Sequence, residues 1–114
     1  MTISRRDAKR MVGKGWSKIL DKLYDVKPRN VDVLQVKEKW GGLRFYVGGA
    51  LREFHDAIEA AEEESYFTCE ECGEYGKLRE DLGWILTLCE KHYQETLSKR
   101  HNNLAEIEKV GKDE

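Results

Sequence analysis

The residues best suited to chemistry are three cysteines and a histidine, which share one 26-residue stretch, TCEECGEYGKLREDLGWILTLCEKHY (68–93). The pattern is Cys-x2-Cys, sixteen residues, Cys-x2-His, and its members are Cys69, Cys72, Cys89 and His92. Three thiolates and one imidazole would give Zn²⁺ the four tetrahedral ligands of a closed structural site. Gly73, directly after the first pair, allows the tight turn of a zinc knuckle. We therefore predict one structural Zn²⁺ per chain at these four residues.

The same residue types also serve other chemistries, and the surrounding sequence argues against each. Free cysteines beside a surface histidine would not need two pairs with the same spacing. A redox Cys-x2-Cys would not need the second pair. A catalytic zinc needs an open ligand position, and four protein ligands leave none. A zinc deaminase needs a His-x-Glu upstream of a Pro-Cys-x-x-Cys, which this sequence lacks.

The residues around the two pairs predict the elements that position them. Residues 75–88 can form a short hairpin that turns near Gly83, with Trp84, Leu86 and Leu88 on one face. Cys89 would end this hairpin, and His92 would fall in the first turn of a helix from about 90 to 109. Residues three apart on a helix share one side, so both ligands would face the same metal.

This order of knuckle, hairpin and helix resembles the treble-clef zinc finger over about residues 67–100, and the four predicted ligands fall at that family's ligand positions. Treble clefs also occur in nucleases of the His-Asn-His type, and RHNN (100–103) invites that comparison. Those residues would lie in mid-helix beyond the ligands, whereas such nucleases need a catalytic histidine at the hairpin. We therefore expect His55 and His101 to be ordinary helix-surface or boundary residues.

Upstream of the cysteines, the sequence first predicts a long helix. Ser4 and Asp7 are spaced as a capping box, with Asp in place of the usual Glu. Apolar residues then recur every three or four positions, which predicts a helix over about 5–25. Gly13 and Gly15 would weaken this helix, and they would allow close packing or a bend.

A hairpin and a second helix follow. VDVLQVKEKWGGLRFYVGG (31–49) has the β-branched and aromatic residues of two strands, and Gly41-Gly42 suits a tight turn between them. Residues 50–66 predict an amphipathic helix with an acidic face. We expect one α+β domain over 1–114, with a helix–hairpin–helix part (1–66) and a zinc-binding part (67–110).

Composition bounds the setting of this domain. The 114 residues are 39% apolar and 37% charged, so the core is thin and a metal would help to hold it. The sequence has no apolar run of transmembrane length. Its start, MTISRRDAKRMVGKGW, lacks the apolar core of a signal peptide. We expect a protein of the bacterial cytosol with no membrane partner, where cysteines commonly hold metal.

Exposed cations and aromatic residues predict a binding surface. The hairpin offers cations interleaved with aromatic rings, at Lys39, Trp40, Arg44 and Tyr46. The first helix adds a basic face with Arg10, Lys14 and Lys18. Residues 1–29 carry net charge +6 and residues 50–81 carry −8. In the alternative interpretation, Arg44 and Tyr46 pack against a helix, and the two charged segments face each other or are simply solvated.

The set EKWGGLRFY, an acidic helix, TCEECG and GWILTLCEKH resembles a group of small uncharacterised zinc-binding proteins of bacteriophages and prophages, over about residues 10–95. The resemblance implies a viral accessory protein that binds and inhibits a host factor, including antiviral defence systems. We therefore expect a binding protein and not an enzyme, engaging a host protein or a nucleotide signal through the predicted surface.

Two other functions stay open. The first is a DNA- or RNA-binding zinc-finger module, which the basic helix favours. The net charge of −2 opposes it, as do Glu70, Glu71 and Glu74 beside the knuckle. The second is a metal-dependent nuclease or nucleotide hydrolase. The identity of the partner and the oligomeric state are not predicted.

Overall fold

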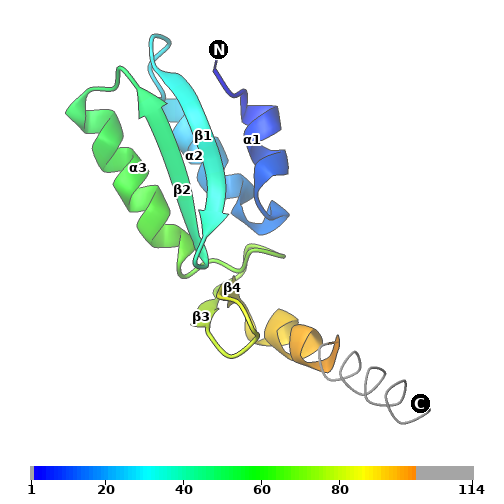
Figure 1. The fold of residues 1–114 in the computed structure, drawn as a ribbon. Helices are drawn as coiled ribbons and strands as arrows, with labels where there is room; N and C mark the ends of the chain where they lie inside the picture. The colour runs from blue at the N-terminus through cyan, green and yellow to red at the C-terminus, as the bar shows by residue number, and fades with distance from the viewer. Residues whose placement is uncertain (1, 100–114) are drawn as a thin grey trace.

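The computed structural model describes residues 2–99, and its order of elements confirms the predicted α+β fold (Figure 1). Helical and strand elements follow in the order α1 (Arg5–Met11), the 3-10 helix η1 (Lys14–Trp16), α2 (Ser17–Val26), β1 (Asp32–Lys39), β2 (Gly42–Gly48), α3 (Arg52–Ser65), β3 (Lys77–Arg79) and β4 (Leu86–Leu88). A last helix begins at residue 90 and is described to residue 99. The rest of the predicted 90–109 helix, with His101 and RHNN, lies outside the described residues. Within residues 2–99, no helix has the length and apolar character needed to cross a membrane.

The predicted first helix is interrupted, and the two glycines explain where. Ser4 caps α1 as predicted, since its Oγ accepts the Asp7 N–H at 3.1 Å. The chain then leaves α1 after Met11 and starts again as η1 and α2. A Cβ on Gly13 would lie 2.3 Å from the carbonyl oxygen of Glu70. The sequence Gly-Lys-Gly thus breaks the helix and lets its backbone touch the knuckle.

The hairpin turns one residue earlier than predicted. Lys39 pairs with Gly42, so Trp40 and Gly41 form the two-residue loop, with φ of 56° and 80°. Such turns favour residues that tolerate positive φ, which tryptophan does poorly. Gly42 is needed for a different reason, because a Cβ there would lie 2.3 Å from Cζ of Tyr66. The pairing of β1 with β2 also has a register shift between Val33 and Gln35.

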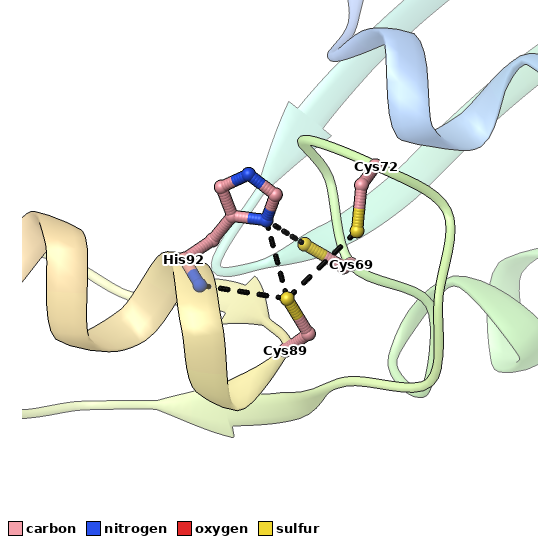
Figure 2. A group of neighbouring side chains, drawn as sticks. All are labelled: Cys69, Cys72, Cys89 and His92. Carbon is pink, nitrogen blue, oxygen red and sulfur yellow. Dashed lines mark hydrogen bonds between the residues drawn. The ribbon is translucent and has the colours of Figure 1, made fainter.

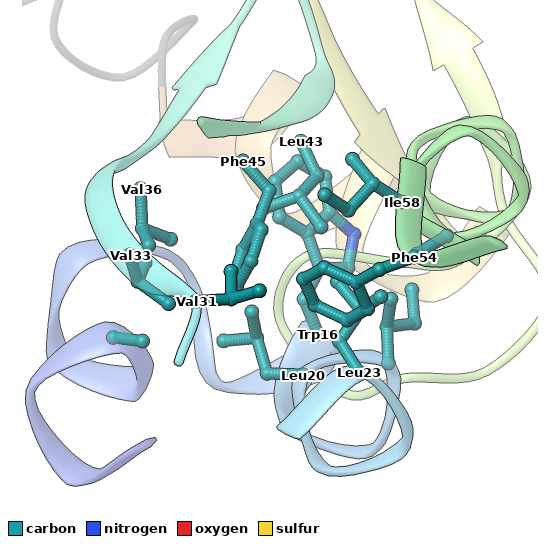
Figure 3. Close-up of a cluster of buried hydrophobic side chains, with 13 residues drawn as sticks. Trp16, Leu20, Leu23, Val31, Val33, Val36, Leu43, Phe45, Phe54 and Ile58 are labelled. Atoms are coloured by element: carbon teal, nitrogen blue, oxygen red, sulfur yellow. The ribbon is translucent and has the colours of Figure 1, made fainter. Parts of the chain in front are cut away.

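The main core lies between the inner face of this sheet and the helices. Figure 1 shows α2 behind the sheet, α1 beside β1 and α3 beside β2. Phe45 stands at the centre, with edge-on contacts to Tyr24 at 5.7 Å and Phe54 at 6.4 Å between ring centroids. Figure 3 shows the cluster around it, which includes Trp16, Leu20, Leu23, Val31, Val33, Val36, Leu43 and Ile58. A second, smaller cluster in the cysteine region includes Cys69, Leu82 and Leu88.

Both edges of the β1–β2 sheet are bonded to other parts of the chain at some positions. On the β2 side, the Leu43 N–H donates to Oγ of Ser65 at 2.8 Å and the Phe45 N–H donates to the Glu62 carboxylate at 2.9 Å. On the β1 side, residues before α1 pair with Val33, whose N–H donates to Oγ1 of Thr2 at 2.8 Å. Helix α3 and the N-terminal segment therefore satisfy edge groups that would otherwise face solvent.

Candidate metal centre and hairpin surface

A tight loop places the first two cysteines together. The Cys69 N–H donates to the Glu74 carbonyl at 2.8 Å, and the Gly73 N–H donates to the Cys69 carbonyl at 2.9 Å. Gly73 has φ of 82°, which glycine adopts freely, so the predicted role of this residue in the turn is confirmed. The loop closes at a bridge between Thr68 and Tyr75.

The β3–β4 hairpin and the last helix place the second pair. Strand β4 ends at Leu88, and Cys89 follows as the residue before the helix. The Tyr93 N–H donates to the Cys89 carbonyl at 2.9 Å, and the His92 N–H points to the Cys89 sulfur at 3.5 Å. Cys89 therefore occupies the N-cap position of this helix, which fixes His92 one turn away on the same side.

The four side chains converge on one point, as Figure 2 shows. Their ligand atoms all lie within 4.8 Å of one another. The Cys72 and Cys89 sulfurs are 3.8 Å apart, and Nδ1 of His92 lies 3.6 Å from the Cys69 sulfur and 3.2 Å from the Cys89 sulfur. A tetrahedral zinc with ordinary bond lengths would separate two sulfurs by about 3.8 Å, and a sulfur from a nitrogen by about 3.6 Å. The predicted cluster is therefore present, and it could hold one metal ion such as Zn²⁺.

The surroundings of two ligands also suit a metal. Burial raises the pKa of Cys69, but backbone N–H groups, the first of them from Cys89, outweigh burial and lower this pKa to about 7. The thiolate, which is the form that binds metal, is thus favoured near neutral pH. On His92, Nε2 points away from the sulfurs and lies 3.9 Å from the Glu95 carboxylate. This distance is longer than a hydrogen bond, so Glu95 places a negative charge near the imidazole without fixing its orientation.

The cysteine region is docked onto the hairpin and η1 through buried polar contacts. The Trp16 Nε1–H donates to the Thr68 carbonyl at 2.9 Å. Thr87 is fully buried, and its Oγ1–H donates to the Gly41 carbonyl at 2.7 Å. The Glu70 carboxylate accepts the Thr87 N–H at 2.7 Å. These bonds connect the metal cluster to the tip of the hairpin and to the main core.

Glu70 is not the surface charge that the sequence predicts. With Glu71 and Glu74 it is predicted to repel phosphate, yet only 8% of it is exposed. Burial raises its pKa to about 7, although the Thr87 N–H acts in the opposite direction. Nothing in the local sequence distinguishes Glu70 from its exposed neighbours, so its structural role could be seen only in the fold.

The hairpin residues predicted for binding lie at the tip and on the outer face. Trp40 is 63% exposed and Tyr46 is 44% exposed. Lys39 is exposed and has no ion pair within residues 2–99. Arg44 is half-buried, because its guanidinium donates to the Tyr66 hydroxyl at 2.8 Å and lies over that ring. The alternative in which Arg44 and Tyr46 pack against a helix thus holds in part, because Arg44 contacts Tyr66, the C-cap residue of α3, whereas Tyr46 is exposed.

Within residues 2–99, basic neighbours of the predicted helix face form ion pairs, whereas the three predicted residues do not. Arg5 pairs with Asp25 at 2.7 Å, and Lys22 pairs with Glu64 at 2.6 Å. The predicted residues Arg10, Lys14 and Lys18 form no ion pair in the described part of the chain.

The fold also separates the two predicted groups. Lys18 lies on α2, which covers the inner face of the sheet, whereas Arg44 and Tyr46 point from the outer face. His55 lies exposed on α3, as expected. Trp84 does not join Leu88 on one face, because it precedes β4 and is 60% exposed.

Comparisons with known protein families, curated proteins and solved structures found no match to this chain.

Proposed function

We propose that this chain is a non-catalytic binding protein in which a structural Zn²⁺ braces the tip of a β-hairpin, and that the tip and outer face of the hairpin contact the partner. One observation carries the proposal. Trp40 is a large apolar residue held at positive φ and 63% exposed, with Lys39 beside it. A folding role would not explain an exposed indole in an unfavourable backbone conformation, whereas contact with a partner would.

Zinc acts as the brace in this proposal. Residues Cys69 and Glu70 touch Gly15, whose N–H donates to the Glu70 carbonyl at 2.8 Å. Thr87, two residues before a third ligand, holds the Gly41 carbonyl. Metal binding to such a site contributes directly to folding free energy, so it would also fix the hairpin tip. Four protein ligands leave no open position for substrate, which supports a structural metal.

The proposed partner is a host protein or a nucleotide signal. Tryptophan, tyrosine and arginine dominate the energy of protein interfaces. The hairpin carries an exposed tryptophan and an exposed tyrosine, with the half-buried Arg44 beside them. The resemblance to phage and prophage proteins supports an inhibitor that acts on a host factor, with antiviral defence as one setting. No catalytic group is assigned to the chain in this proposal.

A second candidate function is binding of DNA or RNA, and one observation favours it. On the outer face, Lys37 lies over the ring of Tyr46 and Arg44 lies over the ring of Tyr66, each at 5.8 Å. Alternating cations and rings suit a single strand, since bases stack on the rings and phosphates pair with the cations.

Capture from bacterial lysate, with mass spectrometry of bound proteins and small molecules, tests the proposed function. The wild-type chain should retain a partner that Trp40→Ala/Tyr46→Ala loses. Leu51→Ala is the matched control, because Leu51 is 74% exposed and lies before α3, outside the hairpin. Equal capture by all three chains would refute the assigned surface. Titration with single-stranded and duplex DNA at two salt concentrations tests the second candidate, which requires tight and strongly salt-dependent binding.

A further inference from the structure

A hollow lies where the hairpin tip meets the loop before β4. Its lining comes from both parts of the chain, with Glu38, Lys39 and Trp40 on one side and Trp84 and Ile85 on the other. Its volume is about 300 Å³, at the lower end of the range for small-molecule sites. Both tryptophans are more than half exposed, and within residues 2–99 neither indole N–H donates a hydrogen bond.

The contact between the β1–β2 hairpin and the β3–β4 hairpin holds the two tryptophans in place. Gly41, next to Trp40, accepts the buried Thr87 hydroxyl at 2.7 Å. A Cβ on Gly41 would lie 2.6 Å from Cδ1 of Leu78 and 3.2 Å from Cγ2 of Ile85. The turn backbone therefore sits directly on the β3–β4 hairpin. The hollow is consequently formed by the fold before any ligand arrives.

Within residues 2–99, one lysine of the lining, Lys39, is free to pair with an anion. Lys39 shares the outer face with Lys37, which lies two residues away on β1. Neither lysine forms an ion pair in the described part of the chain. The single carboxylate of the lining, Glu38, keeps its charge but accepts the Gly41 N–H at 2.7 Å, which directs it toward the turn backbone. Two exposed indoles beside a lysine without an ion pair in the described residues suit a flat ring that carries a negatively charged group.

We infer that this hollow binds a nucleotide, with the base stacked on Trp40 or Trp84 and a phosphate paired with Lys39. The inference rests on the proposed function and gives its ligand a chemical class. A nucleotide combines the flat π-face that indoles stack on with the phosphate that a lysine attracts. The ligand can be a free nucleotide or one unit of a single strand, since both present the same groups.

Nuclear magnetic resonance of the zinc-loaded chain can observe the site directly, because its three tryptophans give three indole N–H signals. The Trp16 indole is buried and bonded to the Thr68 carbonyl, so it is an internal reference. Titration with AMP to about 5 mM, and with the oligonucleotide dT6 to about 1 mM, should shift the Trp40 and Trp84 signals and leave the Trp16 signal in place. AMP binding as tight as dT6 binding identifies a free nucleotide, whereas tighter, salt-dependent dT6 binding identifies a single strand.

Variants give the quantitative test. Trp40→Ala or Trp84→Ala should weaken binding by about 10- to 100-fold, the usual range for one lost stacking contact. Lys39→Glu should also weaken nucleotide binding, and the loss should be larger at low salt than at high salt. The matched controls are Tyr75→Ala, an exposed ring of the knuckle, and Arg29→Glu, an exposed cation before β1, and both should bind as the wild type does.

Two results would overturn the inference. One is the absence of indole shifts with either probe, and the other is binding that Trp84→Ala and Lys39→Glu leave unchanged. If either occurs while Trp40→Ala/Tyr46→Ala still abolishes protein capture, the proposed function stands with a protein partner and only the nucleotide site is lost. If protein capture also survives that double substitution, both proposals fail.

Discussion

Replacement of Gly15 by alanine tests how closely η1 lies against the knuckle. A Cβ on Gly15 would fall 2.0 Å from the Cys69 carbonyl oxygen, 2.6 Å from the Glu70 carbonyl carbon and 2.7 Å from the Gly73 nitrogen. All three atoms belong to the backbone and cannot rotate away. Ordinary contact begins at 3.4 Å, so η1 and the knuckle must separate by about 1.4 Å, the difference between 3.4 and 2.0 Å.

This separation sets the expected cost. It would stretch the 2.8 Å hydrogen bond from Gly15 to Glu70 beyond bonding range, and it would strain the 2.9 Å bond from Trp16 to Thr68. Two such bonds contribute about 1 kcal/mol each, and overpacking costs typically about 1–3 kcal/mol. We therefore expect Gly15→Ala to lower the free energy of unfolding by about 3–5 kcal/mol.

Urea unfolding of the zinc-loaded chain, followed by circular dichroism, measures this loss as a lower midpoint at similar slope. Lys14→Ala is one control, because Lys14 is exposed between the two glycines and should change stability by less than about 0.5 kcal/mol. Gly49→Ala is the second, since its nearest neighbouring atom is 3.8 Å away and only its φ of 77° opposes a side chain. If Gly15→Ala costs no more than Gly49→Ala, the close approach of η1 to the knuckle is wrong.

Three further predictions concern the metal, the contact between the two hairpins and the partly buried phenol of Tyr24. Cys89→Ser should lose about one equivalent of zinc by atomic absorption and unfold the C-terminal part, and retention of both metal and melting temperature would show that the site is misassigned. Thr87→Val should cost about 1–3 kcal/mol in urea unfolding, because the buried Gly41 carbonyl loses its 2.7 Å donor, while Thr2→Val at the β1 edge provides an exposed comparison. Burial raises the pKa of Tyr24 from 10 to about 12, so the folded state holds the phenol proton more tightly than the unfolded state does. The free energy of unfolding should therefore fall as pH rises from about 10 to 12. Tyr24→Phe should flatten that decline, and an unchanged slope would count against the shift.

The metal ligands could be predicted from the sequence because residues that are close in the chain also lie close together in the folded protein. Two residues in a Cys-x2-Cys pair lie close whatever the rest of the chain does, and His92 follows Cys89 by one helical turn. Hydrophobic period predicted the type of each long element for a similar reason, since one buried face dictates it. Local sequence pattern was therefore enough to predict the order of the elements and the residues of the metal cluster.

Residues that act across the fold were not predictable in this way. Gly42 was assigned to the turn, yet it faces Tyr66, which is 24 residues later in the chain. The helix over 5–25 breaks because Gly13 and Gly15 meet the knuckle about 55 residues downstream. Trp84 joins Trp40 only through the docking of two modules. Each depends on a contact between segments that no local pattern relates.

The edge positions of the β1–β2 sheet that are already bonded limit how this protein can recognise a partner. Many proteins bind an extended peptide by adding it as a further strand at a free edge. Here the N–H groups of Leu43 and Phe45 are already bonded to α3, and Val33 is already bonded to the N-terminal segment. An incoming strand would have to displace those bonds before it could form its own. These bonds therefore disfavour strand addition at Val33, Leu43 and Phe45, and at those positions they also oppose edge-to-edge pairing with other copies of the chain.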